Sequence, residues 1–304
     1  MIGSLRLRAK VALPPGRPGG FDHGDVDHRT GRTFVAHTAF GTVDVIDPDS
    51  LESAVAIEDC PEGSGLICAP QERSVFAASR GRGQVVQFDA DRCEVERRFQ
   101  VGPKPNGLAL ANGRMLLVAD VDATDQRARL IDLSTSTSTA AAETLLPGRP
   151  RWCVFDSATD TFLVNIREPA SLLRLSARTG ETEGHWQVSC PGPHGLDLDL
   201  ERRRAFIACD GGKVVVLDLE SGRELGAVAI SGEPDAVWFN PRRQHLYVGI
   251  GNPGVVDVVD TGRLTVAETV VAEPGAKTSA FDVDRQRLYV FLPESSAAAV
   301  FEEG

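Results

Sequence analysis

Side chains that can transfer protons or bind charged groups recur along the chain at a spacing of 41–45 residues. The first series has acidic, basic and neutral polar members, namely Asp22, Ser64, Asn106, Arg151, His194, Asp235 and Lys277. A second series in the same register consists of His37, Ser79, Asp120, Asn165, Cys209, Ile250 and Leu292. If the fold gathers equivalent repeat positions, polar groups of both series converge on one ligand site.

A divalent metal is the first chemistry that these residue types suggest. Asp22, His23 and His37 belong to the first repeat, and imidazole and carboxylate groups suit zinc, manganese or similar ions. His194 or Asp235 would complete the coordination from other repeats, and the metal would polarise a carbonyl group or activate water. No cofactor is certain from the sequence, and a metal held by His23, His37 and Asp22 is the one candidate.

Acid–base chemistry without a metal is the second possibility. His37 or His194 would act as general base or acid, because an imidazole pKa near 6.5 suits that role. Asp235 joins them as a catalytic candidate, while Arg151 and Lys277 would hold a carboxylate, enolate or oxyanion. The predicted ligand-binding residues are Asp22, His23, Ser64, Asn106, Asp120, Arg151 and Lys277.

Short apolar runs with the same period show which elements must position these residues. Such runs between turns are typical of short buried strands. The second run of each repeat begins with Phe34, Phe76, Leu117, Phe162, Phe206, Tyr247 or Tyr289. A third run ends in Asp47, Asp89, Asp132, Ser176, Asp218, Asp260 or Glu302. We expect the aspartates there to cap turns.

A period in the low forties with about four strands per unit predicts a propeller blade. Seven such units account for nearly all 304 residues, which indicates an all-β, seven-bladed β-propeller formed by residues 1–304 as a single domain. The four-stranded blades are expected to start near residues 22, 64, 106, 151, 194, 235 and 277. Residues 1–14 alternate apolar and polar side chains, so they are predicted to form the outer strand of blade seven and to close the ring.

Charge and composition exclude some partners and suggest a compartment. The chain has 32 Lys and Arg residues against 43 Asp and Glu, and its net charge of −11 argues against nucleic acid and anionic membranes. No apolar run is long enough for a signal sequence or a membrane span. None of the six cysteines forms a CxxC motif, and we expect free thiols and a cytoplasmic location.

The repeat resembles the YncE-like, or YVTN-type, seven-bladed propellers, which include lactonase-like members. The resemblance rests on Gly31–Ala36, Arg204–Ala208 and His245–Gly249, which match the second-strand pattern, and on Val43–Asp47 in the third strand. It covers nearly the whole chain and implies the fold. Members range from enzymes to binding and scaffold proteins, and no motif of the lactonase-type or streptogramin-lyase-type propellers maps onto this chain residue by residue.

Two functions are consistent with these patterns. In the first, a small polar or anionic molecule binds in the axial funnel and is converted by a hydrolase or lyase activity that uses histidine acid–base chemistry or a bound metal. In the second, the propeller is a non-catalytic ligand-binding or protein-interaction scaffold. A small-molecule ligand is the expected partner, with a protein partner as the alternative.

Overall fold

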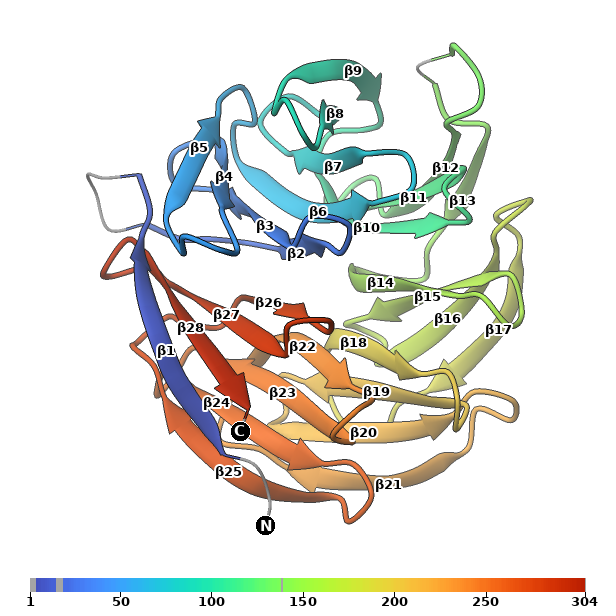
Figure 1. The fold of residues 1–304 in the computed structure, drawn as a ribbon. Coiled ribbons are helices and arrows are strands. Elements are labelled where there is room, and N and C mark those ends of the chain that lie inside the picture. The colour runs from blue at the N-terminus through green and yellow to red at the C-terminus, as the bar shows by residue number, and fades with distance from the viewer. Residues whose placement is uncertain (1–3, 15–18, 138, 304) are drawn as a thin grey trace.

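The computed structural model describes residues 4–14, 19–137 and 139–303, and every regular element within these ranges is a strand. Seven four-stranded antiparallel sheets form the blades of a ring (Figure 1). This arrangement confirms the predicted all-β, seven-bladed propeller. None of the described residues forms a helix long and apolar enough to cross a membrane. All six cysteines lie in the described ranges and are free, as expected.

Each blade runs from an innermost strand at the axis to an outer strand at the rim. The innermost strands are β2 (Gly24–Asp27), β6 (Gly63–Ala69), β10 (Pro105–Ala111), β14 (Pro150–Asp156), β18 (Pro193–Asp199), β22 (Pro234–Asn240) and β26 (Ser279–Asp282). The second strands are β3 (Arg32–His37), β7 (Ser74–Ser79), β11 (Met115–Asp120), β15 (Thr161–Ile166), β19 (Arg204–Cys209), β23 (His245–Ile250) and β27 (Arg287–Leu292). The third strands are β4 (Thr42–Ile46), β8 (Gln84–Asp89), β12 (Arg127–Asp132), β16 (Ser171–Ser176), β20 (Lys213–Asp218), β24 (Val255–Asp260) and β28 (Ala297–Glu303). The outer strands are β5 (Ser53–Ile57), β9 (Val95–Gln100), β13 (Ala142–Leu145), β17 (Thr182–Gln187), β21 (Glu224–Ala229), β25 (Thr265–Val271) and β1 (Leu5–Ala12).

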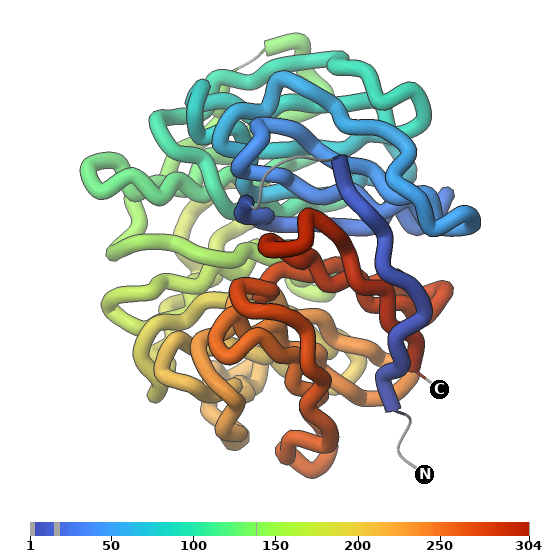
Figure 2. The backbone as a smooth tube through the Cα atoms, turned by 90° about the vertical axis from the view of Figure 1, so that its left-hand side faces the viewer, coloured from blue at the N-terminus to red at the C-terminus, as the bar shows by residue number. Residues whose placement is uncertain are grey.

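The N-terminal strand closes the ring, as predicted. β1 pairs antiparallel with β28, from Leu5 opposite Glu303 to Ala12 opposite Ala297, and completes the sheet β1-β28-β27-β26. Figures 1 and 2 show the blue N-terminal strand beside the red C-terminal one. The pairing covers one edge of β28 that would otherwise be open to another chain. Residues 1–3 of the predicted 1–14 segment lie outside the described residues.

The hydrophobic core lies between the faces of neighbouring blades. The first residues of the second runs are almost completely buried, with exposed fractions of 1% or less, and are Phe34, Phe76, Leu117, Phe162, Phe206, Tyr247 and Tyr289. Burial of each such side chain contributes roughly 2 kcal/mol, so packing between blades, together with strand pairing within them, holds the ring together. At the rim, the carboxylates of Asp89 and Asp260 accept backbone N–H groups of the following turn, which confirms their predicted capping role.

The starts of the innermost strands crowd against one another at the axis. A Cβ atom added to Gly65 would lie 1.8 Å from the Asn106 carbonyl oxygen of the next blade. At Gly195 it would lie 2.3 Å from the Asp235 carbonyl oxygen. Because these neighbours are backbone atoms, they cannot move aside as a flexible side chain would. The glycines therefore allow the polar residues beside them to approach one another.

The variant Gly65→Ala is expected to lower the free energy of unfolding by about 3 kcal/mol, because the added methyl group clashes with the backbone of the next blade. Gly20→Ala is the matched control, since its added Cβ would have no neighbour within 4 Å. Urea denaturation followed by circular dichroism measures both variants. Equal stability of the two variants would contradict the proposed crowding.

Candidate functional site

The Asp235 carboxylate lies at the centre of the polar groups at one end of the axis. Its Oδ1 atom lies 3.2 Å from His194 Nε2 and accepts a 3.3 Å hydrogen bond from Trp152 Nε1. Its Oδ2 atom lies 3.2 Å from Lys277 Nζ. Burial alone would raise the pKa of Asp235, but the charges of His194 and Lys277 hold it well below its usual value. One carboxylate thus connects residues of blades four, five, six and seven.

His194 lies between two carboxylates. Its Nδ1 atom is 2.8 Å from Asp210 Oδ1, and Arg167 Nε donates a 2.8 Å hydrogen bond to the other oxygen of Asp210. Burial lowers the pKa of His194, but the charge of Asp235 and the contacts with both carboxylates outweigh it and raise the pKa above its usual value. Both ring nitrogens have a carboxylate partner, so a proton transfer to a ligand would have to break one of these contacts.

His23 occupies the axis beside this network. Its ring stacks on Trp152 with 4.3 Å between ring centroids, and its Nε2 atom lies 3.4 Å from Asp22 Oδ1. Asp22 also forms an ion pair with Arg80 from blade two. Burial lowers the pKa of His23, so the ring is neutral at pH 7. Through Trp152, the pair of Asp22 and His23 is connected to the contacts of Asp235 with His194 and Lys277.

Arg151 is the exception in this balanced set. Its guanidinium group is half-buried, and its Nε atom is buried without a hydrogen-bond partner. Within the described part of the chain, the Arg151 side chain forms no hydrogen bond and no ion pair within 4 Å. Burial and the nearby Arg149 lower its pKa, although Asp235 and Asp210 contribute opposing charge from farther away. Arg151 is thus a partly desolvated cation that lacks a contacting anion.

His37, the other catalytic candidate, is sealed from solvent. Its exposed fraction is 0%, and its Nδ1 atom lies 2.7 Å from Asp44 Oδ2. Phe21 stacks on the ring at 4.1 Å and Phe40 approaches it edge-on at 4.4 Å. His23, His37 and Asp22 do not place their ligand atoms within 4.8 Å of one another. The structure therefore offers no common centre for the metal predicted at these three residues.

Two of the three remaining predicted ligand-binding residues have side-chain partners within the protein. Ser64 is buried and donates a 2.9 Å hydrogen bond to the Pro105 carbonyl oxygen. Asp120 is also buried and lies 3.5 Å from Arg129 Nη1, so its charge is compensated within blade three. Asn106 is 7% exposed at the start of β10. None of these three side chains forms a hydrogen bond or ion pair with Asp235 within the described part of the chain.

A cavity of about 170 Å³ lies within the ring of innermost strands, and His23 and Trp152 form part of its wall. Most of its lining is apolar, with Leu66 and Phe155 as examples. Innermost strands of six blades contribute to it, and the carboxyl groups of Asp25 and Asp197 are its acidic members.

Asp25, Trp152, Asp197 and Trp238 line the axial cavity but are not among the predicted site residues, although the repeat register contains a signal for them. One residue after the first series, most repeats have a small side chain, and the members are His23, Gly65, Gly107, Trp152, Gly195, Ala236 and Thr278. His23 and Trp152 are the large exceptions. Three residues after the series, Asp25 and Asp197 interrupt an apolar register, in which Trp238 is the one aromatic member. Asp210 had no such signal, because it lies one residue beyond the second series.

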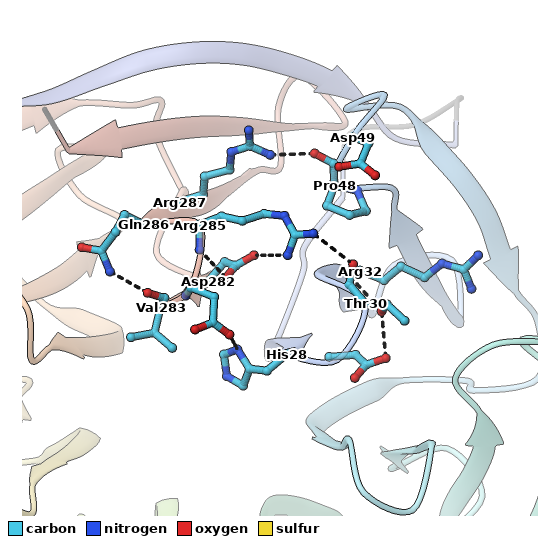
Figure 3. Close-up of polar contacts among 12 residues, drawn as sticks. His28, Thr30, Arg32, Pro48, Asp49, Asp282, Val283, Arg285, Gln286 and Arg287 are labelled. Carbon is cyan, nitrogen blue, oxygen red and sulfur yellow. Dashed lines mark hydrogen bonds and ion pairs between the residues drawn. The ribbon is translucent and has the colours of Figure 1, made fainter.

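A separate group of His28, Asp282 and Asp284 lies where blades one and seven meet (Figure 3). His28 lies in the turn after β2, at the opposite end of that strand from Asp22. Asp282 is buried and its Oδ2 atom lies 3.4 Å from Arg285 Nη1, while Asp284 lies 3.5 Å from Arg242. These guanidinium groups compensate the carboxylates, so the group is explained as a contact between blades.

His194→Gln should make the stability depend less on pH. The raised pKa of His194 means that its stabilisation is complete below pH 6.5 and is lost as the pH rises through the folded-state value. The carboxylates of Asp210 and Asp235 have lowered pKa values, so their contribution to stability is complete only above the unfolded-state pKa of about 4. We expect the variant to lose about 2 kcal/mol at pH 6 and less at pH 9.

Urea denaturation at both pH values measures this effect. His28→Gln serves as the control, because the His28 side chain is 42% exposed and lies 4.0 Å from its carboxylate. A stability loss for His194→Gln that is the same at pH 6 and pH 9 would show that the ion pairs do not contribute.

Comparisons with known proteins support the fold and a limited sequence relationship. No family model matches the chain. A segment of 102 residues is 32% identical to the uncharacterized protein YncE of Salmonella typhimurium and 31% identical to that of Salmonella typhi. Each match covers 33% of this chain and 29% of the length of the curated relative.

Solved structures with much lower sequence identity share the architecture. Kuenenia stuttgartiensis hydrazine synthase matches with a TM-score of 0.84 at 13% identity, over 95% of this chain and 97% of that one. A chain in the crystal structure of the mitotic checkpoint complex matches with a TM-score of 0.83 at 10% identity, over 99% and 92%. At such identities the likeness concerns the fold alone. The protein is a seven-bladed β-propeller, and about a third of its chain is similar in sequence to YncE.

Proposed function

We propose that the protein binds a small anionic molecule at the end of the axis where Asp235 lies, with Arg151 as the main binding residue. The observation that carries this proposal is the half-buried Arg151 guanidinium, which has no hydrogen bond or ion pair within the described residues. A desolvated cation without a counter-charge costs free energy. A bound carboxylate or phosphate group would supply that charge and accept bidentate hydrogen bonds.

The exposure of the neighbouring charges favours the same ligand class. The side chains of Lys277 and Arg167 are 48% and 44% exposed, whereas those of Asp235 and Asp210 are 9% and 15% exposed. The cationic groups therefore lie nearer the solvent than the carboxylates they contact. An approaching anion meets positive charge first, even though the whole chain carries a net charge of −11.

Arg151→Gln is expected to weaken the binding of inorganic phosphate or succinate about tenfold or more, because a charge-assisted hydrogen bond is lost. Isothermal titration calorimetry measures the affinity. The melting temperature should stay equal or rise, since the variant removes an unpaired charge without breaking a contact. Arg263→Gln is the control, because its side chain is 69% exposed and makes only a local contact with Asp260. Unchanged affinity in Arg151→Gln, or no binding to the wild type, would contradict the proposal.

A second candidate is a hydrolase or lyase activity at the same end of the axis, and the observation that favours it is the neutral ring of His23. Among the three axial candidate histidines, His37 is sealed and His194 contacts two carboxylates, whereas His23 contributes to the cavity wall. A neutral imidazole can accept a proton from water or a substrate. The metal site at Asp22, His23 and His37 stays a prediction, and the ligand atoms of these residues do not share a centre. The cytoplasmic location also stays a prediction from the sequence.

If this activity exists, His23→Gln should slow the hydrolysis of a small lactone by roughly 100-fold, which is typical for loss of a general base. The wild-type rate should fall as the pH drops through the lowered pKa of His23, because the protonated ring cannot accept a proton. A pH-stat assay measures both effects, with His28→Gln as the control. Equal rates for His23→Gln and the wild type, or no wild-type hydrolysis, would leave the non-catalytic binding function.

A further inference from the structure

The axial cavity combines two kinds of side chain that together have a defined binding chemistry. Asp25 and Asp197 come from blades one and five, and Trp152 and Trp238 come from blades four and six. The two indole rings are in contact, with centroids 5.9 Å apart and planes at 84°. Their N–H groups already have acceptors, Asp235 Oδ1 and the Ser279 carbonyl oxygen. The rings therefore contribute aromatic surface to the cavity.

Asp25 and Asp197 make equivalent contacts that involve only backbone donors. The Asp25 carboxylate accepts hydrogen bonds of 2.8 Å from the N–H groups of Val26 and Cys68. The Asp197 carboxylate accepts bonds of 2.8 and 2.6 Å from Leu198 and Phe239. In each case one donor belongs to the innermost strand of the next blade. The backbone hydrogen bonds thus orient both carboxyl groups against the strand edges, and neither group has a cationic partner among the described residues.

This lack of a cation distinguishes the cavity from the neighbouring network. Asp22, Asp210 and Asp235 each form an ion pair with an arginine or lysine. Asp25 and Asp197 form none within the described residues, and no arginine or lysine lines the cavity. Burial raises the pKa of both carboxyl groups, that of Asp197 to about 6, and the charge of Asp25 adds to the effect at Asp197.

We propose that this cavity binds a small organic cation, with an ammonium group facing Asp25 and Asp197 and its apolar part against Trp152 and Trp238. Carboxylates supply the counter-charge, and indole rings attract ammonium groups through their quadrupole. An apolar cavity of about 150 Å³ can hold a benzene ring, so one of about 170 Å³ has room for a ligand of six or seven heavy atoms.

A metal ion fits this cavity less well than an organic cation does. Calcium takes six to eight oxygen ligands, whereas the cavity offers two carboxylates among mostly apolar side chains. The described residues include no group of three potential metal ligands there. The aromatic and aliphatic walls instead match the methyl or methylene groups of an ammonium compound.

The site differs from the anion site proposed above. Arg151 and Lys277 do not line the cavity, and His23 and Trp152 stack against each other in its wall. The cation site goes beyond the proposed anion binding and uses different charged residues. A negative result for one site therefore leaves the proposal for the other unchanged.

Choline and its neutral isostere 3,3-dimethyl-1-butanol provide the test. We expect choline to bind to the wild type and to change the tryptophan fluorescence, measured in a Trp186→Phe background so that the signal comes from Trp152 and Trp238. The isostere should bind about tenfold more weakly or worse, because it lacks the charge. Tetrabutylammonium, which is too large for the cavity, controls for general attraction of cations to the net charge of −11.

Asp25→Asn and Asp197→Asn should each weaken choline binding about tenfold or more, since asparagine keeps a hydrogen-bond acceptor but removes the charge. Asp284→Asn is the matched control for an exposed carboxylate remote from the cavity. Thermal melts establish that each variant is folded. Equal affinity for choline and its isostere, no choline binding below about 10 mM, or full affinity in both folded Asp variants would overturn the proposal. The comparison of choline with its isostere uses protein in which Asp25 and Asp197 are unchanged. It therefore tests the proposal even if an Asp variant does not fold.

Discussion

The crowding of seven innermost strands around one axis is the constraint on which the rest of this structure depends. Where neighbouring blades come closest, the backbone of one strand occupies the space that a side chain of the next would need. Gly65 and Gly195 satisfy this constraint because an added Cβ would lie within 2.3 Å of a carbonyl oxygen. His23 and Trp152 stand at the same register position and stack across the axis. Close backbones and a few large side chains therefore define both the network around Asp235 and the cavity.

Charge compensation divides the axis into two environments. Around Asp235, carboxylates and cationic groups from several blades contact one another, so most of the charge there serves to connect blades. Among the described residues, Arg151 departs from this balance because no anion pairs with it, and Asp25 and Asp197 depart from it because no cation pairs with them. Charges that a fold leaves unpaired reduce its stability, and such groups are concentrated at binding sites. The charge of each unpaired group suggests its ligand: an anion for Arg151, and an organic cation for Asp25 and Asp197.

Much of the fold could be predicted because the repeat is regular. Phe34, Phe206 and Tyr247 recur in one register, and each lies buried between blades as a short apolar run implies. The pairing of β1 with β28 was also predictable, because an alternating N-terminal strand had one open position to fill. Less of the site could be predicted. His37 belongs to the expected register, yet its ring turns toward Asp44 and lies under two phenylalanines.

The sequence alone determined the number of blades, the closure of the ring and the types of polar residue at one end of the axis. Repeat spacing suffices for these features, because each blade places equivalent residues at equivalent depth. Only the tertiary structure decided that His194 lies between Asp210 and Asp235 and that Asp25 and Asp197 share a cavity with two indoles. It also decided that Arg151 has no partner among the residues that the structure describes. These features depend on ångström-scale distances between side chains of different blades, which packing around the axis sets and which repeat spacing does not encode.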